Sequence, residues 1–160
     1  AHPHDRKGKQ IIQEVLEDRN MRENVEVFFM EDYGMEDTKT MVSGCDLWLN
    51  NPLRGQEASG TSGMKAAVNG TPQLSVLDGW WIEGHIEDVT GWSIGENYVE
   101  GEDQDEVDSK SIYRKLDHII SIYQNERQKW LKIMKQCIAV NGSYFNTERM
   151  LKEYNVKAYQ

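Results

Sequence analysis

The sequence predicts an α/β fold in which helices flank a parallel β-sheet. Three short segments, mostly apolar and bounded by polar residues, are typical of buried parallel strands: Val25–Met30, Cys45–Leu49 and Gln73–Leu77. Segments with helical spacing of apolar residues lie between them. The order strand, loop, helix, strand across Cys45–Leu77 is that of a βαβ unit.

The first part of the chain is expected to form a helix, a strand and a second helix. Asp5 can cap a helix whose apolar residues recur at helical spacing, namely Ile11, Ile12, Val15 and Leu16. The strand Val25–Met30 follows. The second helix is expected over Met35–Ser43, with Gly44 marking its end.

The strand at Cys45–Leu49 is followed by a loop that enters a short helix. Residues Glu57 to Lys65, E-A-S-G-T-S-G-M-K, lead into Met64–Val68, and Asn69-Gly70 closes the helix. The next strand ends at Asp78-Gly79. The loop therefore lies at the carboxyl end of a strand, where ligands bind in open α/β sheets.

An acidic segment follows, over residues 83–108, with ten acidic residues and no lysine or arginine. A regulatory or partner-binding loop is one interpretation, and a solvated, mobile excursion is the favoured one. Within it, Gly91–Gly95 is expected to form a small strand that returns to the sheet.

The region 109–160 is expected to be helical, with Asn125 separating two apolar stripes. The stripes consist of Ile112, Leu116, Ile119, Ile120 and Tyr123, then Trp130, Ile133, Met134 and Cys137. A last helix is expected to begin at Asn146-Thr147, which can cap it, and to carry Met150, Leu151 and Tyr154 inward. If the apolar face of that helix lacks a partner, its exposed aromatic surface favours self-association into a homo-oligomer.

The Glu57–Lys65 turn has the features of an anion site. Free backbone amides at a helix start and the positive end of the helix dipole attract a phosphate or carboxylate, and Gly60 and Gly63 would let it approach closely. The alternative is an ordinary helix cap in which Ser62 or Thr61 satisfies an orphan amide.

Composition excludes several classes of function. The 160 residues amount to one domain, and the net charge of −9 argues against nucleic acid or an anionic membrane as a partner. No transmembrane, signal-peptide or metal-ligand pattern is present, so a cytoplasmic protein without a metal is expected. Cys45 and Cys137 are expected to be small core residues.

From Asp46 the chain reads D-L-W-L-N-N-P-L-R-G-Q-E-A-S-G-T-S-G-M-K-A-A-V-N-G-T-P-Q-L-S-V-L-D-G. This string closely resembles the cofactor segment of the α-glucan (glycogen, starch, maltodextrin) phosphorylases. The resemblance implies a Rossmann-like domain, the C-terminal half of a two-domain GT-B type glycosyltransferase with extra C-terminal helices. Residues 1–160 would form that single domain as a fragment, and Ala1-His2-Pro3 resembles an interior stretch of the family.

The resemblance also implies roles for the turn residues. Lys65 would hold pyridoxal 5′-phosphate as a Schiff base, and a position near a helix start would disfavour its ammonium form. Thr61, Ser62 and Gly63 would meet the cofactor phosphate. The residues expected to bind the reacting glucose are Glu57, Ala58, Ser59 and Gly60. Glu57 and Lys65 are the catalytic candidates for retaining phosphorolysis of α-1,4-glucan to α-glucose 1-phosphate.

Two other functions remain open on the sequence. Nucleotide-sugar glucosyltransferases of this architecture often carry E-x₇-E, but the second position counted from Glu57 is Lys65. The other open function is that of a non-catalytic remnant, which keeps the fold and serves in assembly or regulation. Gly55-Gln56 departs from the bulkier pair usual before Glu57, and the basic segment for substrate phosphate and the N-terminal half are absent. We therefore expect these 160 residues alone to be inactive on maltodextrin and to lack the cofactor.

Overall fold

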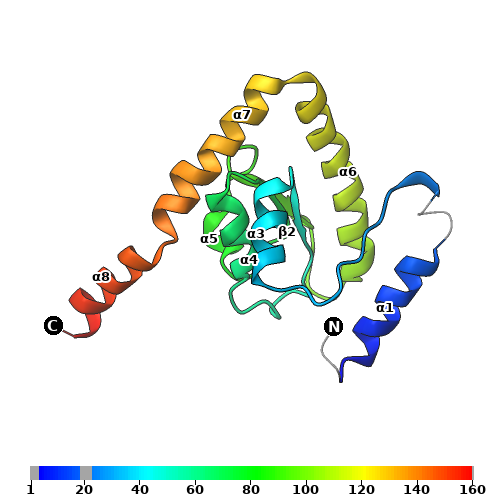
Figure 1. Ribbon diagram of the computed structural model, residues 1–160, viewed down its shortest axis with the longest axis horizontal. Coiled ribbons are helices and arrows are strands. Elements are labelled where there is room, and N and C mark those ends of the chain that lie inside the picture. The colour runs from blue at the N-terminus through cyan, green and yellow to red at the C-terminus, as the bar shows by residue number, and fades with distance from the viewer. Residues whose placement is uncertain (1–3, 19–22, 160) are drawn as a thin grey trace. The chain divides into compact units, whose positions relative to one another are not determined.

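The structure is a computed structural model that describes residues 4–18 and 23–159 (Figure 1). It has two compact units, Ala1–Met35 and Glu36–Gln160. In the first unit, helix α1 spans Arg6–Glu17, and Asp5 caps it by accepting a hydrogen bond from the Gly8 amide at 2.8 Å. The predicted cap is confirmed. Ala1-His2-Pro3, compared above with an interior stretch, lies outside the described residues.

Val25–Met30 forms no strand, so that prediction is wrong for this structure. Phe28 is 87% exposed. A strand exists only where a neighbouring strand takes up its backbone hydrogen bonds, and the described sheet has no strand from this segment. Apolar composition favours burial but does not provide the neighbouring strand.

The second unit contains a three-stranded parallel sheet in the order β1-β2-β3. Its strands are β1 (Trp48–Asn50), β2 (Gln73–Val76) and β3 (Gly91–Ile94). The register pairs Leu49 with Leu74 and Leu74 with Trp92. The α/β fold class and the strand within Gly91–Gly95 are confirmed. β1 is shorter and begins later than the predicted Cys45–Leu49.

The helices of this unit lie around the sheet, except α8, which extends away from it (Figure 1). They are α3 (Met35–Gly44), α4 (Thr61–Val68), α5 (Trp81–Gly84), α6 (Gln104–Asn125), α7 (Arg127–Gln136), a π-helical turn at Cys137–Gly142, and α8 (Thr147–Ala158). α4 connects β1 to the parallel β2, as expected for a βαβ unit. Among the described residues, no helix is long and apolar enough to cross a membrane.

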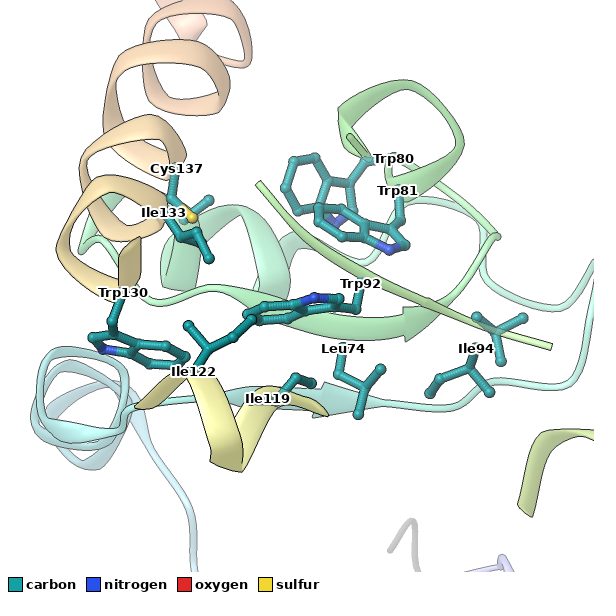
Figure 2. Packing of buried hydrophobic residues seen from close by; sticks show 12 residues of the cluster. Leu74, Trp80, Trp81, Trp92, Ile94, Ile119, Ile122, Trp130, Ile133 and Cys137 are labelled. Atoms are coloured by element: carbon teal, nitrogen blue, oxygen red, sulfur yellow. The ribbon is translucent and has the colours of Figure 1, made fainter. Parts of the chain in front are cut away.

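The core is built around β2 and β3, all of whose residues are buried. Trp92, which is fully buried, stacks on Trp130 of α7 with ring centroids 6.2 Å apart and planes at 16°. Figure 2 shows the cluster around Trp92, to which β2 contributes Leu74 and α6 contributes Ile119 and Ile122. Burial of large aromatic rings against a sheet is the main stabilising contribution here.

The acidic segment is not the solvated excursion that was predicted, because it contains α5, β3 and the start of α6. Its acids pair with basic side chains outside the segment: Glu87 with Lys115, Asp88 with His118, Glu96 with Arg114, and Asp108 with Arg54. Burial opposes the charged form of Glu87, but hydrogen bonds from His85, Lys115 and Ser93 outweigh it and lower its pKa to about 2. Counting charges within the segment missed these partners.

The last helix begins as predicted, since Asn146 accepts a hydrogen bond from the Arg149 amide at 2.9 Å. Its apolar residues do not point inward, however: Met150, Leu151 and Tyr154 are 44%, 59% and 54% exposed. No residue of α8 is buried, because too little of unit 36–160 covers this helix. Cys137 is a core residue as expected, and burial raises its pKa to about 12, whereas Cys45 is only half-buried.

Candidate functional site

The loops that follow the three strands are tied together at the carboxyl edge of the sheet. Arg54, after β1, donates to Asp108 Oδ1 at 2.6 Å and to the carbonyl oxygen of Gly95, after β3, at 3.2 Å. The Glu57 amide donates to Asp78 Oδ2, after β2, at 3.0 Å. The candidate turn and the loop before it are therefore anchored on the segments that follow β2 and β3, at the edge where open α/β sheets bind ligands.

Asp78 is the residue that holds the turn in place. It is buried, and its other oxygen, Oδ1, accepts the Gly79 amide at 2.9 Å. Burial would raise the pKa of Asp78, but hydrogen bonds from the backbone amides of Glu57, Gly79 and their neighbours together lower it. The sequence identified Asp78 only as the end of a strand and missed this role.

We expect Asp78→Asn to lower the free energy of unfolding at pH 7 by about 1 kcal/mol, because one amide loses a charged acceptor. A carboxyl whose pKa is lowered by folding stabilises the protein above its unfolded pKa, and that contribution is lost as pH falls through the folded pKa. Urea denaturation should therefore show a difference in the free energy of unfolding between the native protein and Asp78→Asn that is smaller at pH 3 than at pH 7. A difference independent of pH would contradict this account.

Glycines bring the turn close to the loop after β2. Gly79 has φ +52°, and a Cβ there would lie 2.6 Å from the Ser59 carbonyl oxygen. That oxygen accepts the Trp80 amide at 2.8 Å. Gly63 is buried, and a Cβ on it would lie 1.8 Å from Gln73 Oε1. Gly63 thus makes room for protein side chains, which differs from the expectation that it lets an anion approach.

Helix α4 begins without a side-chain cap. Gly60 is its N-cap residue, with φ +80°, and neither Thr61 nor Ser62 acts as the ordinary cap considered above. The first amides of a helix have no partner within the helix, so those of Thr61 and Ser62 are available to a ligand. This favours the anion-site interpretation of the turn.

Lys65 lies on the same face of α4 as Thr61, one turn further along, and both residues are exposed. The structure places Lys65 in the last turn of this short helix, so its expected position near the helix start is wrong.

A cleft of about 440 Å³ opens beside the start of α4, within the usual size range of ligand sites. Ser59, Thr61 and Met64 form one wall, and the other comes from the segment that enters α8. That second wall consists of Phe145, Asn146, Thr147, Arg149 and Met150. The sequence contained no local signal for it, because residues 59 and 149 meet only in the folded chain. The other predicted site residues lie nearby in sequence but do not line the cleft: Glu57, Ala58, Gly60, Ser62, Gly63 and Lys65.

Sequence comparison connects this chain with characterised enzymes. Residues 8–118 match the family model described as Carbohydrate phosphorylase. The chain is 44% identical to a maltodextrin phosphorylase of Thermococcus litoralis and 44% identical to a glycogen phosphorylase of Aquifex aeolicus, in each case over 99% of the chain. A glycogen phosphorylase of Mycobacterium tuberculosis is 33% identical over 96% of the chain.

These alignments cover 20%, 24% and 19% of the three relatives, so the chain spans about a fifth of their length. Among solved structures, Anabaena HepE in complex with UDP-glucose superimposes with a TM-score of 0.65 at 18% identity, over 95% of this chain and 36% of that one. At this identity the likeness shows a common fold, that of GT-B glycosyltransferases, and nothing about the ligand.

Proposed function

The chain belongs to the carbohydrate phosphorylase family, and from this premise we propose that it forms the C-terminal catalytic part of an α-glucan phosphorylase. The reaction is phosphorolysis of an α-1,4-glucan by inorganic phosphate, which yields α-glucose 1-phosphate with retention, in the presence of pyridoxal 5′-phosphate. The observation that carries the proposal is the exposed Lys65 one turn from the uncapped start of α4.

The residues of α4 fit a ligand that has an aldehyde at one end and a phosphate at the other. The Lys65 amine is exposed for covalent attachment, and the free amides of Thr61 and Ser62 suit the phosphate, with the Thr61 side chain exposed beside them. Because Thr61 and Lys65 share one face, one small molecule can reach both. When bound, pyridoxal phosphate supplies a phosphate group that exchanges a proton with the substrate phosphate.

The preceding loop is suited to hold the sugar. Glu57 is half-buried, its amide is fixed on Asp78, and its side chain lies against Gly60 and Gly79. In the proposed site its carboxylate accepts hydrogen bonds from glucose hydroxyls, the Ser59 hydroxyl donates or accepts them, and Ala58 and Gly60 contribute backbone groups. Fixed hydrogen bonds of this kind orient the reacting carbon toward phosphate and lower the entropic part of the barrier.

The covalent role of Lys65 can be tested by labelling. The protein is incubated with pyridoxal 5′-phosphate, reduced with borohydride, digested and mapped by mass spectrometry. We expect the label on Lys65, and we expect its loss to background in Lys65→Arg, which keeps the charge but has no amine that condenses with an aldehyde. Lys132→Arg, at an exposed lysine of α7, is the matched control and should label normally. Label spread evenly over exposed lysines would refute the assignment.

A further inference from the structure

We propose that Gln104 and Asp108, in the first two turns of α6, are positioning residues for the turn that binds the sugar in the proposed site. They act through Arg54, which lies in the loop between β1 and Glu57. This inference rests on the proposed function for what the turn does. The contacts that hold the loop lie within this chain.

The loop after β1 is held on α6 by a buried set of hydrogen bonds. Arg54 Nη2 donates to Asp108 Oδ1 at 2.6 Å, and the Asp108 side chain is only 7% exposed. Gln104 Nε2 donates to the other Asp108 oxygen at 2.8 Å and to the Pro52 carbonyl oxygen at 3.1 Å. Gln104 Oε1 accepts the Arg54 amide at 3.1 Å. Gln104 therefore fixes the backbone of the loop, while Asp108 fixes the guanidinium.

Gly95 shows how closely the protein fits around this ion pair. It follows β3 with φ +64°, and a Cβ there would lie 1.9 Å from Arg54 Nη2 and 2.1 Å from Asp108 Oδ1. Its carbonyl oxygen accepts Arg54 Nη2 at 3.2 Å, and its amide donates to Ser111 Oγ of α6 at 3.0 Å. The ion pair thus joins the loops after β1 and β3 to one helix, and a side chain at residue 95 would displace it.

Stability alone gives little reason for a buried ion pair at this place. Desolvation of a carboxylate and a guanidinium offsets much of their attraction, and well-packed apolar side chains often stabilise a fold equally well. Apolar side chains do not supply direction, however. Arg54 Nη2 is placed by two oriented acceptors, and the guanidinium lies over the Tyr98 ring, 4.6 Å from its centroid. The pair therefore fixes where the loop lies as well as filling the space.

The fixed loop leads directly into the turn. Only Gly55 and Gln56 separate Arg54 from Glu57, and the Gln56 amide donates to the Leu53 carbonyl oxygen at 3.0 Å. The Glu57 amide is bonded to the buried carboxylate that follows β2. Both ends of this short segment are therefore held, so the backbone that presents Glu57 to a sugar has one position, as orientation of a substrate requires.

Hydrogen exchange tests the proposal and needs no cofactor. Mass spectrometry follows the backbone amides of a peptide covering residues 53–60, with a peptide covering the buried strand β2 as the reference for global opening. Asp108→Asn removes the charge opposite Arg54, and we expect at least tenfold faster exchange in 53–60 with native exchange in β2. Glu106→Gln is the matched control, because it makes the same charge change in an exposed ion pair of α6 and should alter neither peptide.

A second variant separates positioning from stability. Arg54→Met combined with Asp108→Leu removes both charges and fills the space with apolar side chains, so the thermal unfolding midpoint should return close to the native value. Exchange in 53–60 should still be at least fivefold faster than in the native protein, because no oriented hydrogen bond replaces the pair. Gln104→Leu, which frees the loop backbone, should accelerate the same peptide.

The outcomes that overturn the proposal are defined. Native exchange of 53–60 in Asp108→Asn does so, as does equal acceleration of both peptides, which would mean a role in global stability only. Recovery of native exchange in the double variant also does so, because apolar packing would then suffice. Failure to label Lys65 in the native protein refutes the proposed function instead, and the exchange of 53–60 still decides on Asp108.

Discussion

Trp92→Ala is expected to lower the free energy of unfolding by about 3 to 5 kcal/mol, the usual cost of removing a buried indole. The Trp92 side chain is fully buried between the sheet and the C-terminal helices, where it stacks on Trp130 (Figure 2). Its Nε1 donates to Asp88 Oδ1 at 2.8 Å. The substitution therefore leaves a large cavity and removes one hydrogen bond. Urea denaturation followed by circular dichroism measures the effect.

Two comparisons make this result specific. Trp92→Phe keeps most of the buried ring and should cost less than the alanine change. Tyr113→Ala removes an aromatic ring that is 72% exposed, and its effect should stay within about 0.5 kcal/mol. Equal losses for Trp92→Ala and Tyr113→Ala would show that the core does not lie where the structure places it.

Gly79→Ala is expected to destabilise the protein and also to displace the candidate turn. A residue other than glycine in the left-handed region costs about 1 to 2 kcal/mol. The new Cβ would lie 2.6 Å from the Ser59 carbonyl oxygen and 2.9 Å from its carbonyl carbon, so the backbone of the turn has to move, at a further cost of about 1 to 3 kcal/mol. We expect a loss of about 2 to 5 kcal/mol in urea denaturation, and at least a tenfold lower yield of label on Lys65.

Gly101→Ala is the matched control for this substitution. Gly101 has φ +100°, but a Cβ there would meet no atom within 4 Å. It therefore measures backbone strain without the contact to Ser59, and labelling of Lys65 should be unaffected. If Gly101→Ala and Gly79→Ala lowered labelling equally, close packing between the turn and the loop after β2 would not be needed for the site.

Elements encoded by nearby residues were predicted well. Asp5 and Asn146 begin helices α1 and α8 as expected, because a cap depends on a side chain and an amide three residues away. The strand β2 and the end of α3 at Gly44 were also found to within one residue. For the two caps the decisive interaction spans three residues of sequence, whereas β2 also needs its neighbours β1 and β3.

Predictions that depended on distant partners failed. Val25–Met30 has the composition of a buried strand, but a strand requires a neighbour that the segment itself does not encode. The acids of segment 83–108 appeared solvated because Arg54, Lys115 and His118, which neutralise three of them, lie outside that segment. The position of Lys65 relative to the ends of α4 was misjudged because the helix begins at Thr61, before the predicted start at Met64.

The amino-acid sequence by itself determined the α/β class, the parallel βαβ unit and the family turn from Glu57 to Lys65. These depend on periodicity, caps and a contiguous string of residues. Only the tertiary structure revealed that Asp78 holds the amide of Glu57, and that the start of α8 forms the second wall of the cleft beside Thr61. The reason is physical: contacts between residues far apart in the chain form only when packing of the core brings their elements together.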